Sequence, residues 1–146
     1  MTPDFDLTRF LPYLLNQAAE EASLAFQDIY KTRYGLLRTE WRVLFHLGQI
    51  GDMTANEICR RSRMHKTKIS RAVQKLETRR LLSRQTDAGD RRREVLSLTP
   101  EGRVIYQKLR GEAEVFEQRL ADAFDPDEIR VLRSVLTRIA DGETKI

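Results

Sequence analysis

The sequence has few of the residues from which disulfide frameworks and metal centres are built. Its 146 residues include one cysteine, Cys59, and two histidines, His46 and His65. One cysteine excludes an intrachain disulfide, and no group of Cys, His and acidic residues has the spacing of zinc ligands. No run of about 18 apolar residues is present, which excludes a membrane-spanning helix. We therefore expect no metal, no cofactor and no membrane partner.

The chain also lacks the groupings that catalysis requires. It shows no paired nucleophile and base, no metal cluster and no glycine-rich phosphate loop. Cys59 lies between Ile58 and Arg60, where a small buried residue is a simpler interpretation than a redox sensor. The first residues, MTPDFDLTRF, are polar and acidic and do not suit a secretory signal. We expect a cytoplasmic protein that is not an enzyme.

Positive charge is concentrated in one part of the chain. From Arg60 to Arg93 there are 13 Lys or Arg residues and 3 Asp or Glu residues, a local charge of +10, whereas the other residues sum to −6. A basic block in an otherwise acidic chain predicts a localised anion-binding surface. The alternative is a solvated basic face that has no partner.

Apolar spacing and capping residues predict a mainly α-helical protein with one small β-hairpin. Pro12 either marks the start of the first helix near Leu11 or kinks an earlier turn. Thr39 is the expected N-cap of the second helix, which Gly48 and Gly51 end. The expected helices cover residues 11–31, 40–47, 54–61, 66–79, 99–123 and 125–141, and the expected strands cover residues 81–85 and 94–98. Two short helices, a tight turn and a hairpin form the outline of a winged helix-turn-helix.

The helix expected from residue 66 to 79 has two different faces. Apolar residues lie on one face at helical spacing, while the opposite face and its flanks carry hydroxyl, amide and cationic groups. Those groups can bind phosphates and base edges in the major groove of DNA. The apolar face contains Ile69, Ala72, Val73 and Leu76; the DNA-binding candidates are Thr67, Lys68, Ser70, Arg71, Gln74 and Lys75. An ordinary amphipathic surface helix is the alternative.

Three adjacent arginines, Arg91, Arg92 and Arg93, are expected at the hairpin tip. They repel one another, and an external polyanion would relieve that repulsion. An arginine at a hairpin tip can enter a narrow minor groove, where the negative potential is strongest. Asp90 is expected to accept hydrogen bonds from Arg92 or from the loop backbone and so to shape the wing.

The segment from Asp90 to Gly102 resembles the wing signature of the MarR family of regulators. Matching positions are Asp90, Arg92, Leu96, Leu98, Thr99 and Gly102. The segment 66–77 resembles the family's recognition helix, and the likeness extends over nearly the whole chain. The family usually has glycine shortly before the first wing strand, where this chain has Arg79-Arg80-Leu81.

This resemblance implies a homodimer, a palindromic double-stranded DNA operator and, usually, repression that a small ligand relieves. It also implies that Thr67, Lys68, Ser70 and Arg71 face DNA and that Arg92 lies at the wing tip. A second class of function stays open, namely a winged-helix module that binds a protein and no specific DNA.

The terminal regions are expected to form the dimer. Residues 1–34 and 100–146 carry apolar stripes at helical spacing, and residues 35–99 form the DNA-binding lobe. One copy offers few partners for that apolar surface, which a second chain would bury. A monomer with a local helical bundle is the alternative.

The sequence offers candidate lining residues for a ligand pocket between the dimer helices and the DNA-binding lobe. The resemblance implies an aromatic or carboxylate effector for it. The candidate lining is Tyr13, Tyr30, Trp41, Arg42, His46 and Phe116. For each of these residues alone, a place in the core or on the surface is the simpler interpretation.

Overall fold

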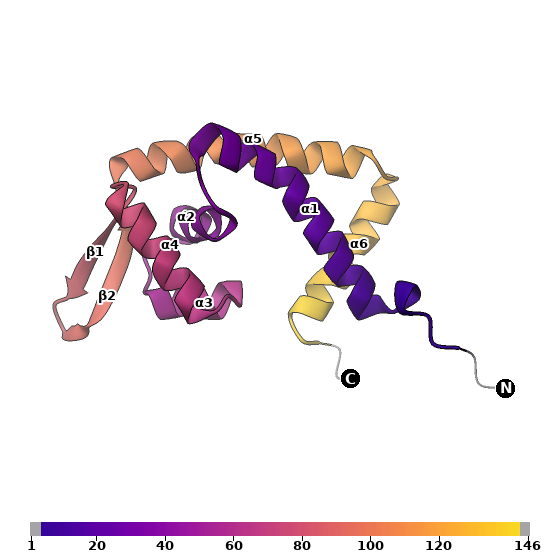
Figure 1. Ribbon diagram of the computed structural model, residues 1–146, viewed down its shortest axis with the longest axis horizontal. Coiled ribbons are helices and arrows are strands. Elements are labelled where there is room, and N and C mark those ends of the chain that lie inside the picture. The colour runs from indigo at the N-terminus through magenta and orange to yellow at the C-terminus, as the bar shows by residue number, and fades with distance from the viewer. Residues whose placement is uncertain (1–3, 144–146) are drawn as a thin grey trace. The chain divides into compact units, whose positions relative to one another are not determined.

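The computed structural model describes residues 4–143, and these are mostly helical with one antiparallel hairpin (Figure 1). This confirms the predicted fold class. Two compact units divide between Leu109 and Arg110, within the fifth α-helix. No helix of the described part is both long and apolar enough to cross a bilayer. The elements are η1 (Leu7–Arg9), α1 (Leu11–Tyr34), α2 (Arg38–Gln49), α3 (Ala55–Ser62), α4 (Lys66–Thr78), β1 (Leu82–Asp87), β2 (Asp90–Leu98), α5 (Pro100–Asp122) and α6 (Pro126–Ala140).

Proline and glycine act differently at the ends of the first two helices. Pro12 lies in the first turn of α1, where its missing N–H costs nothing, so the interpretation of Pro12 as a helix start is confirmed. The predicted N-cap of α2 is wrong, because Leu37 occupies that position and Thr39 lies inside the helix. The predicted end of α2 is wrong as well, because the helix continues through Gly48 to Gln49.

Gly48 is required by packing and does not end the helix. A Cβ atom at this position would lie 2.5 Å from the ring of Tyr106. The Tyr106 side chain therefore lies directly on the backbone of α2, and its hydroxyl donates to Gln49 Oε1 at 2.9 Å. This contact ties α5 to α2 within the first unit.

The core of the first unit lies beneath α4. The four apolar residues predicted for the hidden face of α4 are all buried, each no more than 2% exposed. Helix α4 contacts α2, α3 and β1, and β2 in turn contacts α2 and α3. The other side of α4 therefore remains open to solvent. The buried side chains around α4 include Val43, Leu44, Leu47, Ile58, Leu82 and Leu96.

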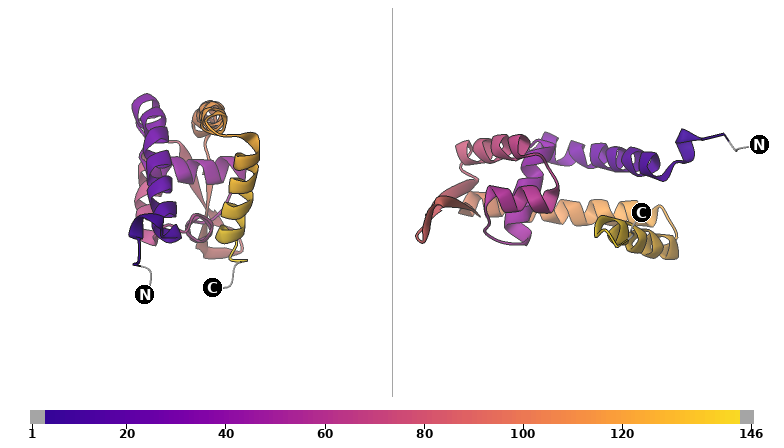
Figure 2. Two further views of the ribbon diagram at one scale, coloured as in Figure 1. Left: turned by 90° about the vertical axis from the view of Figure 1, so that its right-hand side faces the viewer. Right: turned by 90° about the horizontal axis from the view of Figure 1, so that it is seen from below.

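The hairpin extends away from α2, α3 and α4 as a two-stranded arm (Figure 2). Its register runs from Leu82 opposite Leu98 to Thr86 opposite Glu94, and then shifts so that Asp87 lies opposite Asp90. The turn is thus Ala88-Gly89, and the prediction that the arginines lie in the tip loop is wrong. Arg91, Arg92 and Arg93 belong to β2 and occupy the register shift. A shift of this kind bends and twists a hairpin, which re-aims its side chains.

The start of α5 is held against the short segment between α4 and β1. Thr99 donates its hydroxyl to the Arg80 carbonyl at 2.6 Å and accepts the backbone N–H of Gly102 at 3.0 Å. Its own N–H donates to the Leu81 carbonyl at 3.1 Å. Arg80 has a φ of 60°, the left-handed conformation that glycine adopts most easily. The MarR pattern usually has a glycine shortly before the first wing strand. In this chain Arg80 adopts the left-handed conformation at that place, which explains why the glycine is missing.

The second unit consists of the end of α5 and all of α6. Asp125 caps α6 by accepting the Asp127 N–H at 2.9 Å, and the Glu128 side chain accepts the Asp125 N–H at 3.1 Å. The predicted start of this helix is confirmed. An ion pair joins Arg133 to Glu117. None of the residues of α6 is buried.

Candidate nucleic-acid interface

The helix-turn-helix is built from two capped helices. In the sequence, Thr54 and Glu57 have the three-residue spacing that predicts a capping box. The structure confirms it, because Thr54 Oγ1 accepts the N–H of Glu57 at 3.2 Å and the Glu57 carboxylate accepts the N–H of Thr54 at 3.3 Å. Helix α3 ends at Ser62, and its C-cap Arg63, with a φ of 58°, turns the chain towards α4. His65 caps α4 through Nδ1, which accepts the Thr67 N–H at 3.2 Å. Sequence reasoning missed His65, because histidine is not among the preferred N-cap residues.

The open face of α4 carries all of the residues predicted to contact DNA from this helix. Each of them is exposed, and they come from successive turns on the side opposite the buried apolar residues. A groove of about 570 Å³ borders this face, between α4 and the start of α2. Its lining includes Arg71, Gln74, Lys75 and Thr78 from α4. The face therefore presents cations beside neutral donors and acceptors, a mixture that can bind both phosphates and bases.

The end of α4 is anchored to its neighbours by arginines that sequence reasoning did not single out. Arg79 donates to the Tyr34 carbonyl at 2.8 Å and to the Gly35 carbonyl at 3.3 Å. Arg84 bridges Glu77 at 3.2 Å and Glu94 at 3.1 Å, so that it joins α4 to both wing strands. These contacts hold α4, the end of α1 and the hairpin in one arrangement.

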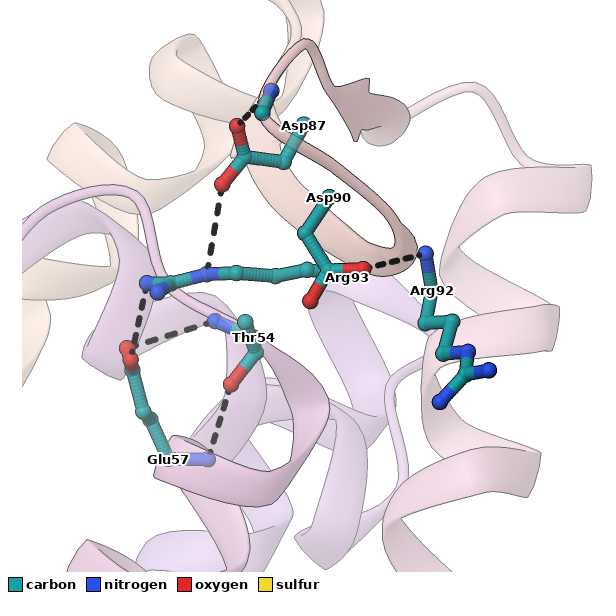
Figure 3. Close-up of polar contacts among 7 residues, drawn as sticks. Thr54, Glu57, Asp87, Asp90, Arg92 and Arg93 are labelled. Atoms are coloured by element: carbon teal, nitrogen blue, oxygen red, sulfur yellow. Dashed lines mark hydrogen bonds and ion pairs between the residues drawn. The ribbon is translucent and has the colours of Figure 1, made fainter.

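The arginines of the wing have different partners (Figure 3). Asp90 Oδ1 accepts the backbone N–H of Arg92 at 3.0 Å, so the backbone is the partner of Asp90 in the wing. The Arg92 guanidinium points away from Glu57. Arg93 instead reaches α3, where its Nη2 lies 3.2 Å from Glu57 Oε1, and its Nε lies 3.8 Å from Asp87 Oδ2.

Glu57 therefore has two structural tasks. Its carboxylate completes the capping box of α3 and also binds Arg93 from the wing. The orientation of the wing relative to the helix-turn-helix is thus linked to a helix cap. Sequence reasoning could find the capping box from its spacing, but not the pair with Arg93, which lies 36 residues away.

Four of the candidate pocket residues, Tyr30, Trp41, Arg42 and His46, lie close together in the first unit. The rings of Tyr30 and Trp41 are 5.8 Å apart, within an aromatic cluster that includes Phe26, Phe45 and Tyr106. The Arg42 guanidinium lies 5.9 Å from the centre of the Trp41 ring, and His46 Nδ1 lies 2.6 Å from the Arg42 carbonyl. Of the two other residues, Tyr13 lies in the first turns of α1 and Phe116 belongs to the second unit.

Cys59 and the histidines do not form a metal site. Among residues 4–143, no group of three or more Cys, His, Asp and Glu side chains is placed to bind a metal ion. Cys59 is half-buried, not fully buried as the sequence suggested.

A capped helix-turn-helix with an open, cationic and polar second helix, followed by a hairpin rich in arginine, defines a winged-helix transcription regulator. Comparison with known proteins leads to the same class of protein. The family model described as "MarR family" matches residues 34–93. A MarR family transcriptional regulator from Silicibacter pomeroyi DSS-3 is 34% identical, with a TM-score of 0.78 over 93% of this chain and 99% of that one. This chain belongs to the MarR family of transcription regulators, whose members are not enzymes.

Two further relatives extend the comparison. The homoprotocatechuate degradative operon repressor of Escherichia coli is 25% identical over 136 residues, which is 92% of this chain and 91% of that protein. The BpsR regulator of Bordetella bronchiseptica has the same fold, with a TM-score of 0.85 and 22% identity over 95% of this chain and 99% of that one.

Proposed function

We propose that this protein is a homodimeric repressor that acts in the cytoplasm and binds a palindromic double-stranded DNA operator. The observation that carries the proposal is the open face of α4 beside the arginine-bearing wing. Arg79 joins the end of α4 to the end of α1, Arg84 joins α4 to the wing, and Arg93 joins the wing to α3. The E. coli relative, a degradative operon repressor, supports repression as the outcome.

The residues of α4 and those of the wing have different roles in this proposal. The open face of α4 enters the major groove with Thr67, Lys68, Ser70, Arg71, Gln74 and Lys75. Arg91 and Arg92 contact the minor groove or its phosphates. Arg93 acts differently, since its guanidinium is already paired with Glu57 and Asp87 and holds the wing in place. Asp90 shapes the bend from which Arg92 extends.

The proposal is tested by DNA binding at several salt concentrations for two neighbouring variants. The wild type should bind fragments of the chain's own promoter region, with affinity that falls steeply as salt rises. Arg92→Ala removes a DNA contact and should weaken binding about fivefold to tenfold, with a shallower salt dependence. Arg93→Ala keeps the contact made by Arg92 and should weaken binding less. If the wild type binds no such fragment at low salt, the proposal fails and the protein-binding alternative gains support.

The dimer proposal rests on exposed apolar surface in the terminal regions. In α6 the side chains of Val131, Leu132, Val135, Leu136 and Ile139 are 39% to 49% exposed and recur at helical spacing. Phe5, Leu7 and Leu11 before and within α1 are half exposed or more. Water contact with so much apolar surface is unfavourable, and a second copy would remove it. We therefore assign residues 1–34 and 100–146 to dimerisation and residues 35–99 to DNA binding.

Light scattering at micromolar concentration tests this assignment. The wild type should have twice the mass of one chain. Leu132→Asp places a charge on the apolar stripe of α6 and should shift the mass towards that of one chain, while Arg130→Ala, an exposed change on the same helix, should not. A wild-type mass of one chain at this concentration contradicts the dimer.

A small effector is the remaining part of the proposal. Binding of DNA by BpsR is regulated by 6-hydroxynicotinic acid, an aromatic carboxylic acid. We propose a ligand of this class for the present protein. The aromatic cluster around Tyr30 and Trp41, with Arg42 and His46 beside it, supports that choice, and Tyr13 and Phe116 stay candidates for its lining.

A further inference from the structure

A buried carboxylate lies beside the groove that borders the open face of α4. Glu40, in the first turn of α2, is 3% exposed and lines this groove. Its Oε2 atom has no hydrogen-bond partner among residues 4–143. Removing a carboxylate from water is unfavourable unless hydrogen bonds replace the water, so buried carboxylates are nearly always paired. The unsatisfied oxygen therefore indicates a donor that reaches Glu40 in another state of the protein.

The groove brings Glu40 together with the cations of α4. Its lining includes Glu40 and Leu37 beside Arg71, Lys75 and Arg79. Arg79 already donates to two backbone carbonyls at the end of α1. That leaves Arg71 and Lys75, whose side chains are exposed, as the cations that can turn towards Glu40.

A donor from within the chain fits this groove better than a cation from solution. Arg71, Lys75 and Arg79 give the lining a positive charge, which repels a metal ion or an amine. Nor does the part of the chain that the structure describes place three or more Cys, His, Asp and Glu side chains together for a metal ion. The partner of Glu40 is therefore expected on α4.

Arg71 suits this role better than Lys75. A guanidinium carries five N–H donors in one plane, so it can bond two acceptors of guanine and still donate to a carboxylate. An ammonium is a point charge on a flexible stem and has no plane to be fixed. A carboxylate behind the guanidinium of Arg71 would hold that plane in the orientation that a base edge requires.

We propose that Glu40 is a positioning residue for base recognition by Arg71. In the DNA complex, the Glu40 side chain turns its free oxygen into the groove and accepts a hydrogen bond from the Arg71 guanidinium. The guanidinium is thereby held in one orientation and loses less freedom when it meets a base. Glu40 itself does not touch DNA. The inference rests on the proposed function, in which α4 reads the major groove.

The stability of the free protein distinguishes this role from a structural one. Burial of a charge without a partner is unfavourable, and a neutral side chain of the same shape removes that penalty. Glu40→Gln should therefore leave the urea midpoint unchanged or raise it. If Glu40 only supported the fold, its replacement would lower the midpoint. A lower midpoint, together with equal losses of affinity for every duplex, overturns the inference.

The functional test is fluorescence anisotropy at one salt concentration with two duplexes. One is a fragment of the chain's own promoter region that the wild type binds, and the other is a scrambled duplex of equal composition. Glu40→Gln should lower the ratio of the two affinities about fivefold, through weaker binding of the promoter fragment. Affinity for the scrambled duplex should not fall, because loss of a negative charge does not weaken phosphate contacts. Glu21→Gln removes one exposed negative charge from α1 and should leave the ratio unchanged.

A double-mutant cycle identifies the partner of Glu40. In an Arg71→Ala background, Glu40→Gln should not change the ratio further, because the side chain that it positions is gone. In a Lys75→Ala background, Glu40→Gln should still lower the ratio about fivefold. The reverse pattern would assign Glu40 to Lys75 and overturn the inference. Full wild-type preference in the E40Q variant refutes the inference alone, whereas absence of DNA binding by the wild type contradicts the proposed function.

Discussion

Replacement of Gly102 by alanine should lower the free energy of unfolding by about 3 kcal/mol. A Cβ atom on this residue would lie 1.9 Å from the Leu81 carbonyl oxygen and 2.8 Å from the carbonyl carbon. Both obstructing atoms belong to the backbone, so no side-chain rotation can relieve the overlap. The start of α5 would have to move away from the end of the recognition helix and the wing.

That movement would break the hydrogen bonds that hold the junction. The Thr99 N–H donates to Leu81 at 3.1 Å, and the Thr99 hydroxyl is bonded on both sides, at 2.6 and 3.0 Å. Each lost hydrogen bond costs about 1 kcal/mol, and the remaining strain adds to that cost. The urea midpoint of the G102A variant should therefore fall, and its DNA affinity should fall too because the wing loses its anchor.

Gly111 provides the matched control for this substitution. It lies in α5 as well, but a Cβ atom there meets nothing within 4 Å. Gly111→Ala should raise stability by about 0.5–1 kcal/mol, because alanine loses less backbone freedom in a helix. Equal urea midpoints for G102A and wild type would contradict the close approach at Leu81.

Replacement of Arg71 by alanine should weaken binding to a cognate operator by about tenfold to a hundredfold. Arg71 lies in the middle of the open face of α4 and borders the groove beside α2. A guanidinium at that position can bond two acceptors of guanine, an interaction worth about 1–3 kcal/mol against a wrong base. The loss should be much smaller on non-cognate DNA, which is bound through phosphates.

Fluorescence anisotropy with cognate and scrambled duplexes at one salt concentration measures both losses. Arg119→Ala removes the same side chain from an exposed position in the second unit and serves as the control. Thermal melting of each variant shows whether α4 is intact, which we expect because Arg71 is exposed. Unchanged preference for the cognate duplex in R71A would remove Arg71 from direct base recognition.

Much of the fold follows from signals that are local in the sequence. The capping boxes at Thr54 and Asp125 mark the starts of α3 and α6, because both partners of each box lie within four residues. The periodicity of residues 69–76 separates the buried and open faces of α4, since a regular helix alone decides which side chains share a face. The candidate DNA-binding set on α4 could be named for the same reason.

Other features depend on residues that are far apart in the chain. The sequence places Arg91, Arg92 and Arg93 side by side, but only the bend in β2 separates Arg93, which binds Glu57, from Arg92, which does not. Gly48 resembles a helix end in the sequence, yet Tyr106 shows it to be a packing position. The sequence also does not reveal the partners of Arg79, since they are backbone carbonyls at the end of α1.

The sequence by itself therefore determined the class of protein, the helix-turn-helix and the open face of α4. Those depend on charge, helical periodicity and capping, which act over one or two turns of chain. Only the tertiary structure decided that Arg93 of the wing pairs with Glu57 and that Gly102 has no room for a side chain. These depend on which distant backbone and side-chain atoms come into contact, and packing of the whole unit sets those contacts.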